Sequence, residues 1–219
     1  MQKLIRSVEI FCYCISISLF QLPTSAVSQP TSFNEAINFP ASSNGGGTSM
    51  LDLDDGYLIV GWGAEPTYNE NFAIKIYKTD KYGNEIWRKI YGKPGTRYVT
   101  GLAGSLILTE DSNFAFAGTV QDSATLLTQV LLFKFNGNGD SLWSRIYNYS
   151  GFDFAYQCQQ DREGNYYILG IAGEHGSGNE NTFLLKTFSN GQLIWSKSYD
   201  TPGYDLSLIH ISEPTRPST

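Results

Sequence analysis

The sequence is poor in cysteine, histidine and charged residues. Its 219 residues include three cysteines and two histidines, and charged side chains make up 16% of the chain. Cys12 and Cys14 lie in an apolar N-terminal stretch, which leaves Cys158 alone and without an internal disulfide partner. A lone cysteine in an apolar strand is usually a buried, inert thiol. We therefore expect neither a disulfide-stabilised domain nor a histidine-rich metal site.

The chain also lacks an excess of basic residues and a long hydrophobic run. A formal charge of −6 argues against nucleic acid as a partner and gives no reason to expect attraction to anionic lipid. The apolar run over 10–22 is shorter than the ~18–20 residues of a membrane span. It follows Lys3 and Arg6 and precedes small residues around Ala26. This order predicts a secretory signal peptide over 1–28 and no membrane insertion after its cleavage.

What the chain has is a motif that occurs three times. The motif reads G-x-x-(I/L)-W-x-(K/R)-x-Y-x-x-x-G. Its first glycine, tryptophan and tyrosine are Gly83, Trp87 and Tyr91, then Gly139, Trp143 and Tyr147, then Gly191, Trp195 and Tyr199. The tryptophans are 56 and 52 residues apart. A period of this size indicates a repeat architecture.

Each copy of the motif predicts a β-strand bounded by glycine. Its aromatic and β-branched residues favour a strand over a helix, and alternate residues of a strand share a face. Trp87, Lys89 and Tyr91 then point one way, and a cation between two rings can lie over one of them, for about 0.5–1 kcal/mol when exposed. Sugar stacking is the alternative role for these rings. Their periodicity favours packing between repeats, because each repeat must bury its face on a neighbour.

The segments before each motif repeat as well. Apolar runs end in a lysine five residues before the motif glycine, at Lys78, Lys134 and Lys186. Upstream, an acidic turn precedes a strand ending at Gly61, Gly118 and Gly170, and a weaker strand is expected over 48–53, 102–109 and 155–160. About four short antiparallel strands per period is the content of one β-propeller blade.

The predicted fold class is therefore all-β, with about three four-stranded blades of an incomplete propeller. The expected segments are a linker over 29–47, a first blade over 48–95, a second over 96–151 and a third over 152–205. Residues 206–219 break the pattern: Leu206 begins Leu-Ser-Leu-Ile-His-Ile-Ser-Glu-Pro-Thr-Arg, which resembles the translation of a transposase adapter used to prepare DNA libraries. We expect this tail to be non-native, and the natural chain to continue with another repeat.

Two resemblances follow from these motifs. Asp80-Lys-Tyr-Gly-Asn-Glu-Ile-Trp-Arg-Lys-Ile-Tyr-Gly and Asp54-Asp-Gly-Tyr-Leu-Ile-Val-Gly resemble the propeller-like repeats of secreted Bacteroidetes proteins, over roughly 48–205. That resemblance implies a cargo of type IX secretion. The spacing of four from glycine to tryptophan also resembles the docking motif of quinoprotein propellers, in which the tryptophan packs between blades. The alanine and threonine positions of that motif are not kept, and no adjacent cysteines are present, so only the structural role is carried over.

Two segments suggest metal binding or catalysis, but each has a simpler structural interpretation. Asp52-Leu-Asp54-Asp55-Gly56 hints at a calcium loop, but Gly56 stands where a further ligand would be, and acids recur at the same place as turn residues. His175 lies in a glycine-rich loop without catalytic partners, and His210 lies in the tail. We expect no catalytic, cofactor-binding or metal-binding residue in this chain.

The expected function is that of a secreted or cell-surface repeat module with a structural or binding role, which is not itself an enzyme. Its expected partner is an extracellular protein or glycan of unknown identity. The first alternative is the non-catalytic propeller portion of a larger extracellular enzyme, such as one that degrades polysaccharide. The second is a fragment of a quinoprotein-type dehydrogenase.

Overall fold

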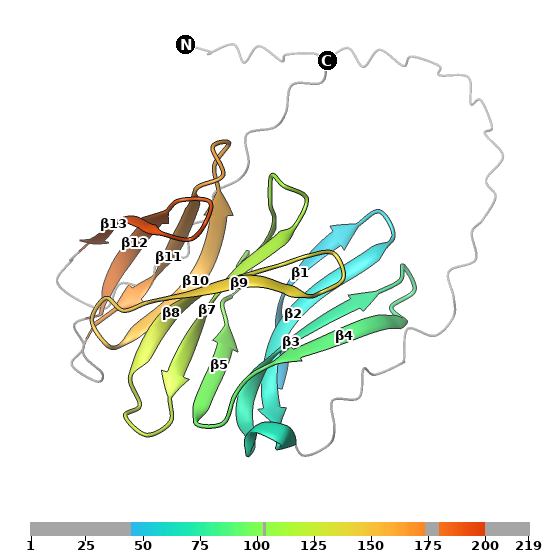
Figure 1. Ribbon diagram of the computed structural model, residues 1–219, viewed down its shortest axis with the longest axis horizontal. Coiled ribbons are helices and arrows are strands. Elements are labelled where there is room, and N and C mark those ends of the chain that lie inside the picture. Colours follow the sequence, from blue (N-terminus) through green and yellow to red (C-terminus); the bar gives the residue numbers. More distant parts are fainter. Residues whose placement is uncertain (1–44, 103, 174–179, 200–219) are drawn as a thin grey trace, which may run out of the picture. The chain divides into compact units, whose positions relative to one another are not determined.

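The computed structural model describes residues 45–102, 104–173 and 180–199. These residues form thirteen β-strands in three antiparallel sheets, with one short 3₁₀-helix at Pro66–Tyr68 (Figure 1). The all-β class expected from the sequence is therefore confirmed. The strands of each sheet are not closed into a barrel, and each sheet keeps two edges.

The first sheet has the strand order β1-β2-β3-β4. Its strands are β1 (Gly45–Leu53), β2 (Gly56–Glu65), β3 (Asn71–Thr79) and β4 (Glu85–Tyr91). The expected linker extended through residue 47, whereas Gly45–Gly47 belong to β1 and pair with β2. The reason is a close backbone approach: a Cβ at Gly61 would lie 2.2 Å from the Gly46 carbonyl oxygen. Glycine at these positions permits the two strands to pair closely. From the sequence alone, a run of glycines with this role looks the same as a loop.

The second sheet has five strands because its first strand is broken. They are β5 (Thr96–Thr100), β6 (Leu106–Leu108), β7 (Phe114–Asp122), β8 (Thr128–Phe135) and β9 (Ser141–Tyr147). Both β5 and β6 pair with β7, at successive positions along it. The strand expected over 102–109 is confirmed only at Leu106–Leu108, because strand pairing ends at Thr100 and resumes at Leu106. Gly101 lies in the break, and a side chain there would meet the Tyr156 carbonyl oxygen at 2.6 Å.

The third sheet repeats the four-strand order of the first. Its strands are β10 (Asp153–Gln160), β11 (Tyr166–Ala172), β12 (Asn181–Thr187) and β13 (Leu193–Tyr199). In every sheet a motif strand, β4, β9 or β13, is the last strand and pairs with the strand that carries the recurrent lysine. Each of these pairings contains a β-bulge after Lys78, Lys134 or Lys186.

An exposed apolar residue of the motif lies at this bulge. In the first sheet Lys78 pairs with Trp87 and Thr79 pairs with Glu85, which leaves Ile86 between them as the extra residue. A bulge of this kind adds one residue to one strand and changes the direction of its side chains. Ile86 is 56% exposed, and its counterparts Leu142 and Ile194 are also exposed.

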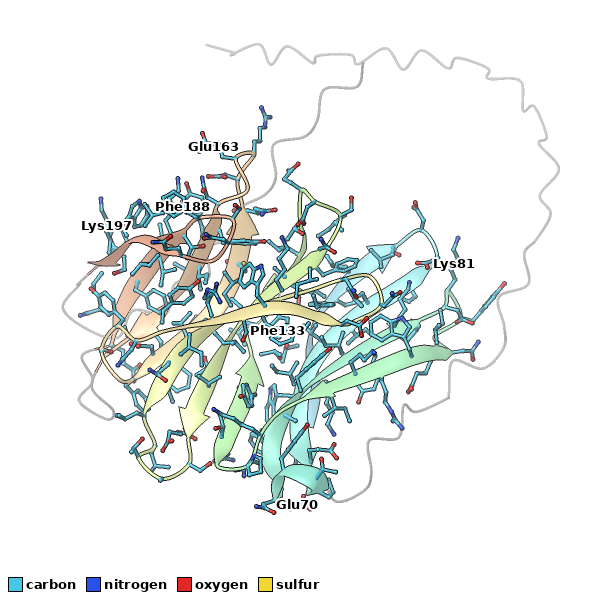
Figure 2. All side chains as sticks on the ribbon, in the orientation of Figure 1. Glu70, Lys81, Phe133, Glu163, Phe188 and Lys197 are labelled. Carbon is cyan, nitrogen blue, oxygen red and sulfur yellow. The ribbon has the colours of Figure 1, made fainter. Side chains whose placement is uncertain are left out.

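The core forms two clusters, one on each face of the second sheet. One cluster joins Leu58 and Ile76 of the first sheet to Phe116 and Phe133 of the second, and Figure 2 labels Phe133. The other cluster joins small and aliphatic residues of β7 and β8 to side chains of the third sheet, including Tyr166. Because both faces of the second sheet are buried, β7 and β8 are almost continuously apolar rather than alternating.

Candidate functional site

The motif strands present three side chains on one face, and we call each such set a cradle. The first cradle is Trp87, Lys89 and Tyr91 on β4, the second is Trp143, Arg145 and Tyr147 on β9, and the third is Trp195, Lys197 and Tyr199 on β13. Their alternate spacing on a strand brings them to a common face. Trp87 and Tyr91 pack against the first core cluster, and Trp143 and Tyr147 pack against the second.

The motif glycines lie in three turns of the same geometry, which we call the glycine turns. They span 80–84, 136–140 and 188–192. In each, the first residue donates its N–H to the carbonyl of the fifth, and the glycine donates its N–H to the carbonyl of the first. Gly83, Gly139 and Gly191 have φ of 86°, 79° and 78°. This left-handed region favours glycine because other residues place Cβ against the backbone there.

The first cradle holds the second glycine turn. Tyr91 donates its hydroxyl proton to the Gly139 carbonyl oxygen at 2.6 Å and accepts the N–H of Ser141 at 3.1 Å. Lys89 Nζ lies 2.8 Å from Asp140 Oδ1. That hydrogen bond raises the pKa of Lys89 and lowers the pKa of Asp140, so both groups are charged near neutral pH.

Contact in this first cradle is close enough to exclude a side chain at the glycine. A Cβ built on Gly139 would lie 2.6 Å from Trp87 Cζ3 and 2.8 Å from Lys89 Cγ. The motif glycine therefore has two separate requirements, a positive φ and contact with the tryptophan and lysine of the preceding sheet. Only the first of these was visible in the sequence.

The second cradle holds the third glycine turn in the same way. Tyr147 donates its hydroxyl proton to the Gly191 carbonyl oxygen at 2.6 Å. A Cβ on Gly191 would lie 2.7 Å from Arg145 Cγ and 2.9 Å from Trp143 Cζ3. Burial raises the pKa of Tyr147, which keeps its hydroxyl protonated as a donor. Gln192 stands where the second turn has Asp140, so this contact has no counterpart of the Lys89–Asp140 ion pair.

The cations of the cradles behave in two ways. Arg145 lies over the Trp143 ring at 5.7 Å from its centroid, and Lys197 lies over the Trp195 ring at 5.6 Å, both within the ~6 Å of a cation–π contact. The sequence predicted this arrangement. Lys89 instead reaches Asp140 of the neighbouring turn. The acid that distinguishes the first contact lies 51 residues away, so the local motif did not reveal it.

The third cradle is the most open of the three. Tyr199 is 50% exposed, whereas Tyr91 and Tyr147 are partly buried by the glycine turns that they bind. Trp195 makes an edge-on contact with Tyr167, with ring centroids 6.4 Å apart. Residues 200–219 lie outside the described residues, as do 1–44. The expectations for the signal peptide, the closing Gly203 and the adapter-like tail therefore stay predictions.

Each recurrent lysine forms an ion pair with an acid of its own sheet. Lys78 pairs with Asp55, Lys134 with Asp111 at 2.6 Å, and Lys186 with Asp161 at 3.6 Å. The sequence alone indicates turn residues at these acids and assigns no role to the lysines. Their separations could have revealed the pairing: the first two pairs are each 23 residues apart, and the third spans residues 161 to 186.

Of the three pairs, Lys134–Asp111 has the most buried lysine side chain. The side chains of Lys134 and Asp111 are 7% and 52% exposed. Partial burial works to raise the pKa of Asp111, but hydrogen bonds from Lys134 and Thr109 outweigh it and hold this pKa well below its ordinary value. Burial works to lower the pKa of Lys134, and its hydrogen bond with Asp111 raises it overall. The pair is therefore ionised across the physiological range, a structural use of charge in a sheet with few charges.

Other residues singled out in the sequence are placed as follows. Asp55, from the calcium-like segment, is engaged by Lys78, and in the described parts of the chain no group of three or more His, Cys, Asp or Glu residues could hold a metal ion. Cys158 is buried, and burial raises the pKa of its thiol. His175 lies outside the described residues. Within 45–102, 104–173 and 180–199, no helix is long and apolar enough to cross a membrane.

The geometry assembles two contacts in which the motif of one sheet binds the glycine turn of the next. Six of the nine motif residues expected to be structural take part in these contacts: Trp87, Tyr91, Gly139, Trp143, Tyr147 and Gly191. Trp195 instead contacts Tyr167 of its own sheet. Gly83 and Tyr199 lie at the two ends of the series. In comparisons with known proteins, the chain matches no protein-family model and no curated protein.

Proposed function

We propose that the chain is a propeller-type repeat module, secreted or displayed on the cell surface, whose role is structural or binding and not catalytic. The observation that carries the proposal is the repeated contact between a cradle and a glycine turn. It joins the first sheet to the second and the second to the third with the same residue types. A chain built from one contact in this way extends by adding sheets, which is the construction principle of propellers and other repeat proteins.

The chemistry of the repeat is consistent with a structural role. The three recurrent lysines are used in ion pairs within their own sheets. The tyrosines of the first two cradles donate to backbone carbonyls. The motif residues thus contribute to sheet packing, and binding surfaces in such arrays are formed by loops and faces that vary between repeats.

The location outside the cell rests on the signal-peptide-like segment over 1–28. An extracellular protein or glycan is the proposed class of partner. The propeller architecture itself goes beyond the three antiparallel sheets that are described, and is supported by their four-strand order and by the repeated sheet-to-sheet contact.

The structural role can be tested at the second cradle. Trp143→Ala removes a ring that packs in the core cluster and against Gly191, and such a truncation typically costs about 3–5 kcal/mol. We expect a clear fall in the melting temperature measured by circular dichroism. Leu142→Ala is the matched control, since Leu142 is the neighbouring residue of β9 and is 47% exposed. A Trp143→Ala chain that melts like the wild type but no longer binds glycans recognised by the wild type would assign the ring to recognition instead.

A further inference from the structure

The glycine turns contain asparagine directly before glycine. Three such pairs lie wholly within the described residues: Asn136-Gly137, Asn138-Gly139 and Asn190-Gly191. In this sequence the glycine nitrogen can attack the preceding side-chain amide, because glycine has no Cβ to hinder the approach. The first two pairs share one turn, which joins β8 to β9 and is held by the first cradle (Figure 1). The three pairs differ in how the turn holds the attacking nitrogen and the carbonyl that it attacks.

The side-chain carbonyl of Asn136 has two hydrogen-bond donors. Its Oδ1 accepts the backbone N–H of Asn138 and the backbone N–H of Asp140, both at 2.9 Å. The first of these bonds makes an Asx turn, which folds the side chain back along the following residue. Two N–H groups at this distance from a carbonyl oxygen form an oxyanion hole, because they stabilise the negative charge that develops on the oxygen when a nucleophile attacks the carbonyl carbon.

The backbone nitrogen of Gly137 is the nucleophile closest in the chain. Gly137 is exposed, and a Cβ built on it would meet nothing within 4 Å. Within 45–102, 104–173 and 180–199, no acceptor receives a hydrogen bond from its N–H. Water or hydroxide can therefore reach this N–H and remove its proton, which must happen before the nitrogen can form a new bond.

The other two pairs have a blocked nitrogen. Gly139 donates its N–H to the Asn136 carbonyl oxygen, and Gly191 donates its N–H to the Phe188 carbonyl oxygen, both at 2.9 Å. Both glycines are also buried beneath a cradle. The side chain of Asn190 accepts one backbone N–H on its Oδ1, so the blocked nitrogen is what sets this pair apart. One hydrogen bond to the reacting N–H is equivalent to about a tenfold difference in rate.

We propose that Asn136 is a site of spontaneous deamidation, activated by the turn in which it lies. The Gly137 nitrogen loses its proton to water or hydroxide and forms a bond to Asn136 Cγ. The bond from Cγ to the side-chain nitrogen breaks, and that nitrogen takes a proton from solvent and leaves as ammonia. The product is a cyclic succinimide. Water opens it at either ring carbonyl, which gives aspartate or isoaspartate, and in isoaspartate the main chain is longer by one methylene group.

The two products should affect the first cradle differently. Aspartate fits the turn, because Asp80 holds the first glycine turn in the same way, with two backbone N–H groups at 2.8 and 2.9 Å from its Oδ1. Isoaspartate lengthens a turn whose ends are joined by hydrogen bonds from Asn136 to Asp140 and from Gly139 to Asn136. It should therefore move Gly139 away from Tyr91 and weaken the contact between the first and second sheets.

Peptide mapping by mass spectrometry tests the proposal on the full chain, incubated at mildly alkaline pH both folded and in urea. For each Asn-Gly pair, the deamidation rate in the folded chain is divided by the rate in the unfolded chain, which removes the intrinsic reactivity of the sequence. We expect this ratio to be at least about tenfold larger for Asn136 than for Asn138 or Asn190. Equal ratios, or a smaller ratio at Asn136, would overturn the proposal, because the hydrogen bonds to Oδ1 would then protect the side chain.

Two variants complete the experiment. Gly137→Ala should slow deamidation at Asn136 in the folded chain and melt like the wild type, since its Cβ meets nothing within 4 Å and its φ lies outside the left-handed region. An unchanged rate would show that the Gly137 nitrogen is not the nucleophile. Asn136→Asp has the charge of the deamidated chain with a normal backbone. The deamidated fraction of aged wild type, isolated by ion exchange, should melt below Asn136→Asp, and equal melting temperatures would overturn the effect on the cradle.

Discussion

Adding one methyl group to a motif glycine should separate backbone strain from sheet-to-sheet contact. Gly83 and Gly139 have similar φ values of 86° and 79°. Alanine at either position carries the same penalty for a left-handed conformation, about 1–2 kcal/mol. At Gly83 the added Cβ meets open space, whereas at Gly139 it would lie 2.6 Å from Trp87 Cζ3. The ring is rigid and packed on the core, so overpacking adds about 1–3 kcal/mol.

The expected totals are about 1–2 kcal/mol for Gly83→Ala and about 2–5 kcal/mol for Gly139→Ala. For a chain of this size 1 kcal/mol shifts the melting temperature by about 2–4 °C, so Gly139→Ala should melt about 2–12 °C below Gly83→Ala. Differential scanning calorimetry measures both melting temperatures. Gly191→Ala should behave like Gly139→Ala, because its Cβ would lie 2.7 Å from Arg145 Cγ. Equal melting temperatures for the Gly83 and Gly139 variants would refute the cradle contact.

Three further predictions concern Tyr147, Asp111 and Cys158. Tyr147→Phe loses the hydrogen bond to the third glycine turn and should lower the free energy of unfolding by about 0.5–1.5 kcal/mol in urea titrations, with an unchanged m-value. Asp111→Asn leaves the buried Lys134 ammonium without its carboxylate and should lower the free energy of unfolding by about 1–2 kcal/mol near pH 7. The cost is smaller than for a fully buried pair because Asp111 is half exposed. The control Glu110→Gln should change the free energy of unfolding little. The pKa of Asp111 in the folded state lies below its unfolded value of about 3.9, so the ion pair stabilises the protein above that pH and the stabilisation is lost as pH falls through the folded pKa. The free energy of unfolding should therefore decline more between neutral pH and about pH 2 in the wild type than in Asp111→Asn. Parallel curves of stability against pH would contradict this. Cys158, buried and with a raised thiol pKa, should react with a thiol reagent only after unfolding, and rapid labelling of the native protein would show that its site opens.

Local patterns in the sequence were sufficient for the strands but not for what joins the sheets. The strand ending at Tyr91 and its counterparts were predictable because glycine, aromatic and β-branched residues are local signals. The bulge at Ile86 was not predictable, because it arises from a cross-strand pairing that skips one residue. The strand at Gly45–Gly47 was not predictable either, because a glycine run signals a turn unless a partner strand is known.

The candidate site shows the same difference between local features, which the sequence predicts, and contacts between sheets, which it does not. The sequence indicated that Trp87, Lys89 and Tyr91 share a face, since that follows from alternation along one strand. It did not indicate that the face binds Gly139 and Asp140 of the next repeat, because that contact depends on how two sheets pack. The ion pairs of the recurrent lysines were within reach, because a constant separation of 23 residues in two repeats is a sequence observation.

A double-mutant cycle between the tryptophan and the glycine tests the central claim, which is that the motif of one sheet holds the glycine turn of the next. Trp87→Leu removes the ring atoms that lie 2.6 and 2.8 Å from the Cβ position of Gly139, and keeps an apolar side chain on the core. The free energy of unfolding is measured for the wild type, for Trp87→Leu, for Gly139→Ala and for the double variant. If the contact is as described, Gly139→Ala should cost less in the Trp87→Leu background, approaching the cost of Gly83→Ala. If the two single costs simply add, Trp87 and Gly139 do not meet and the account is wrong.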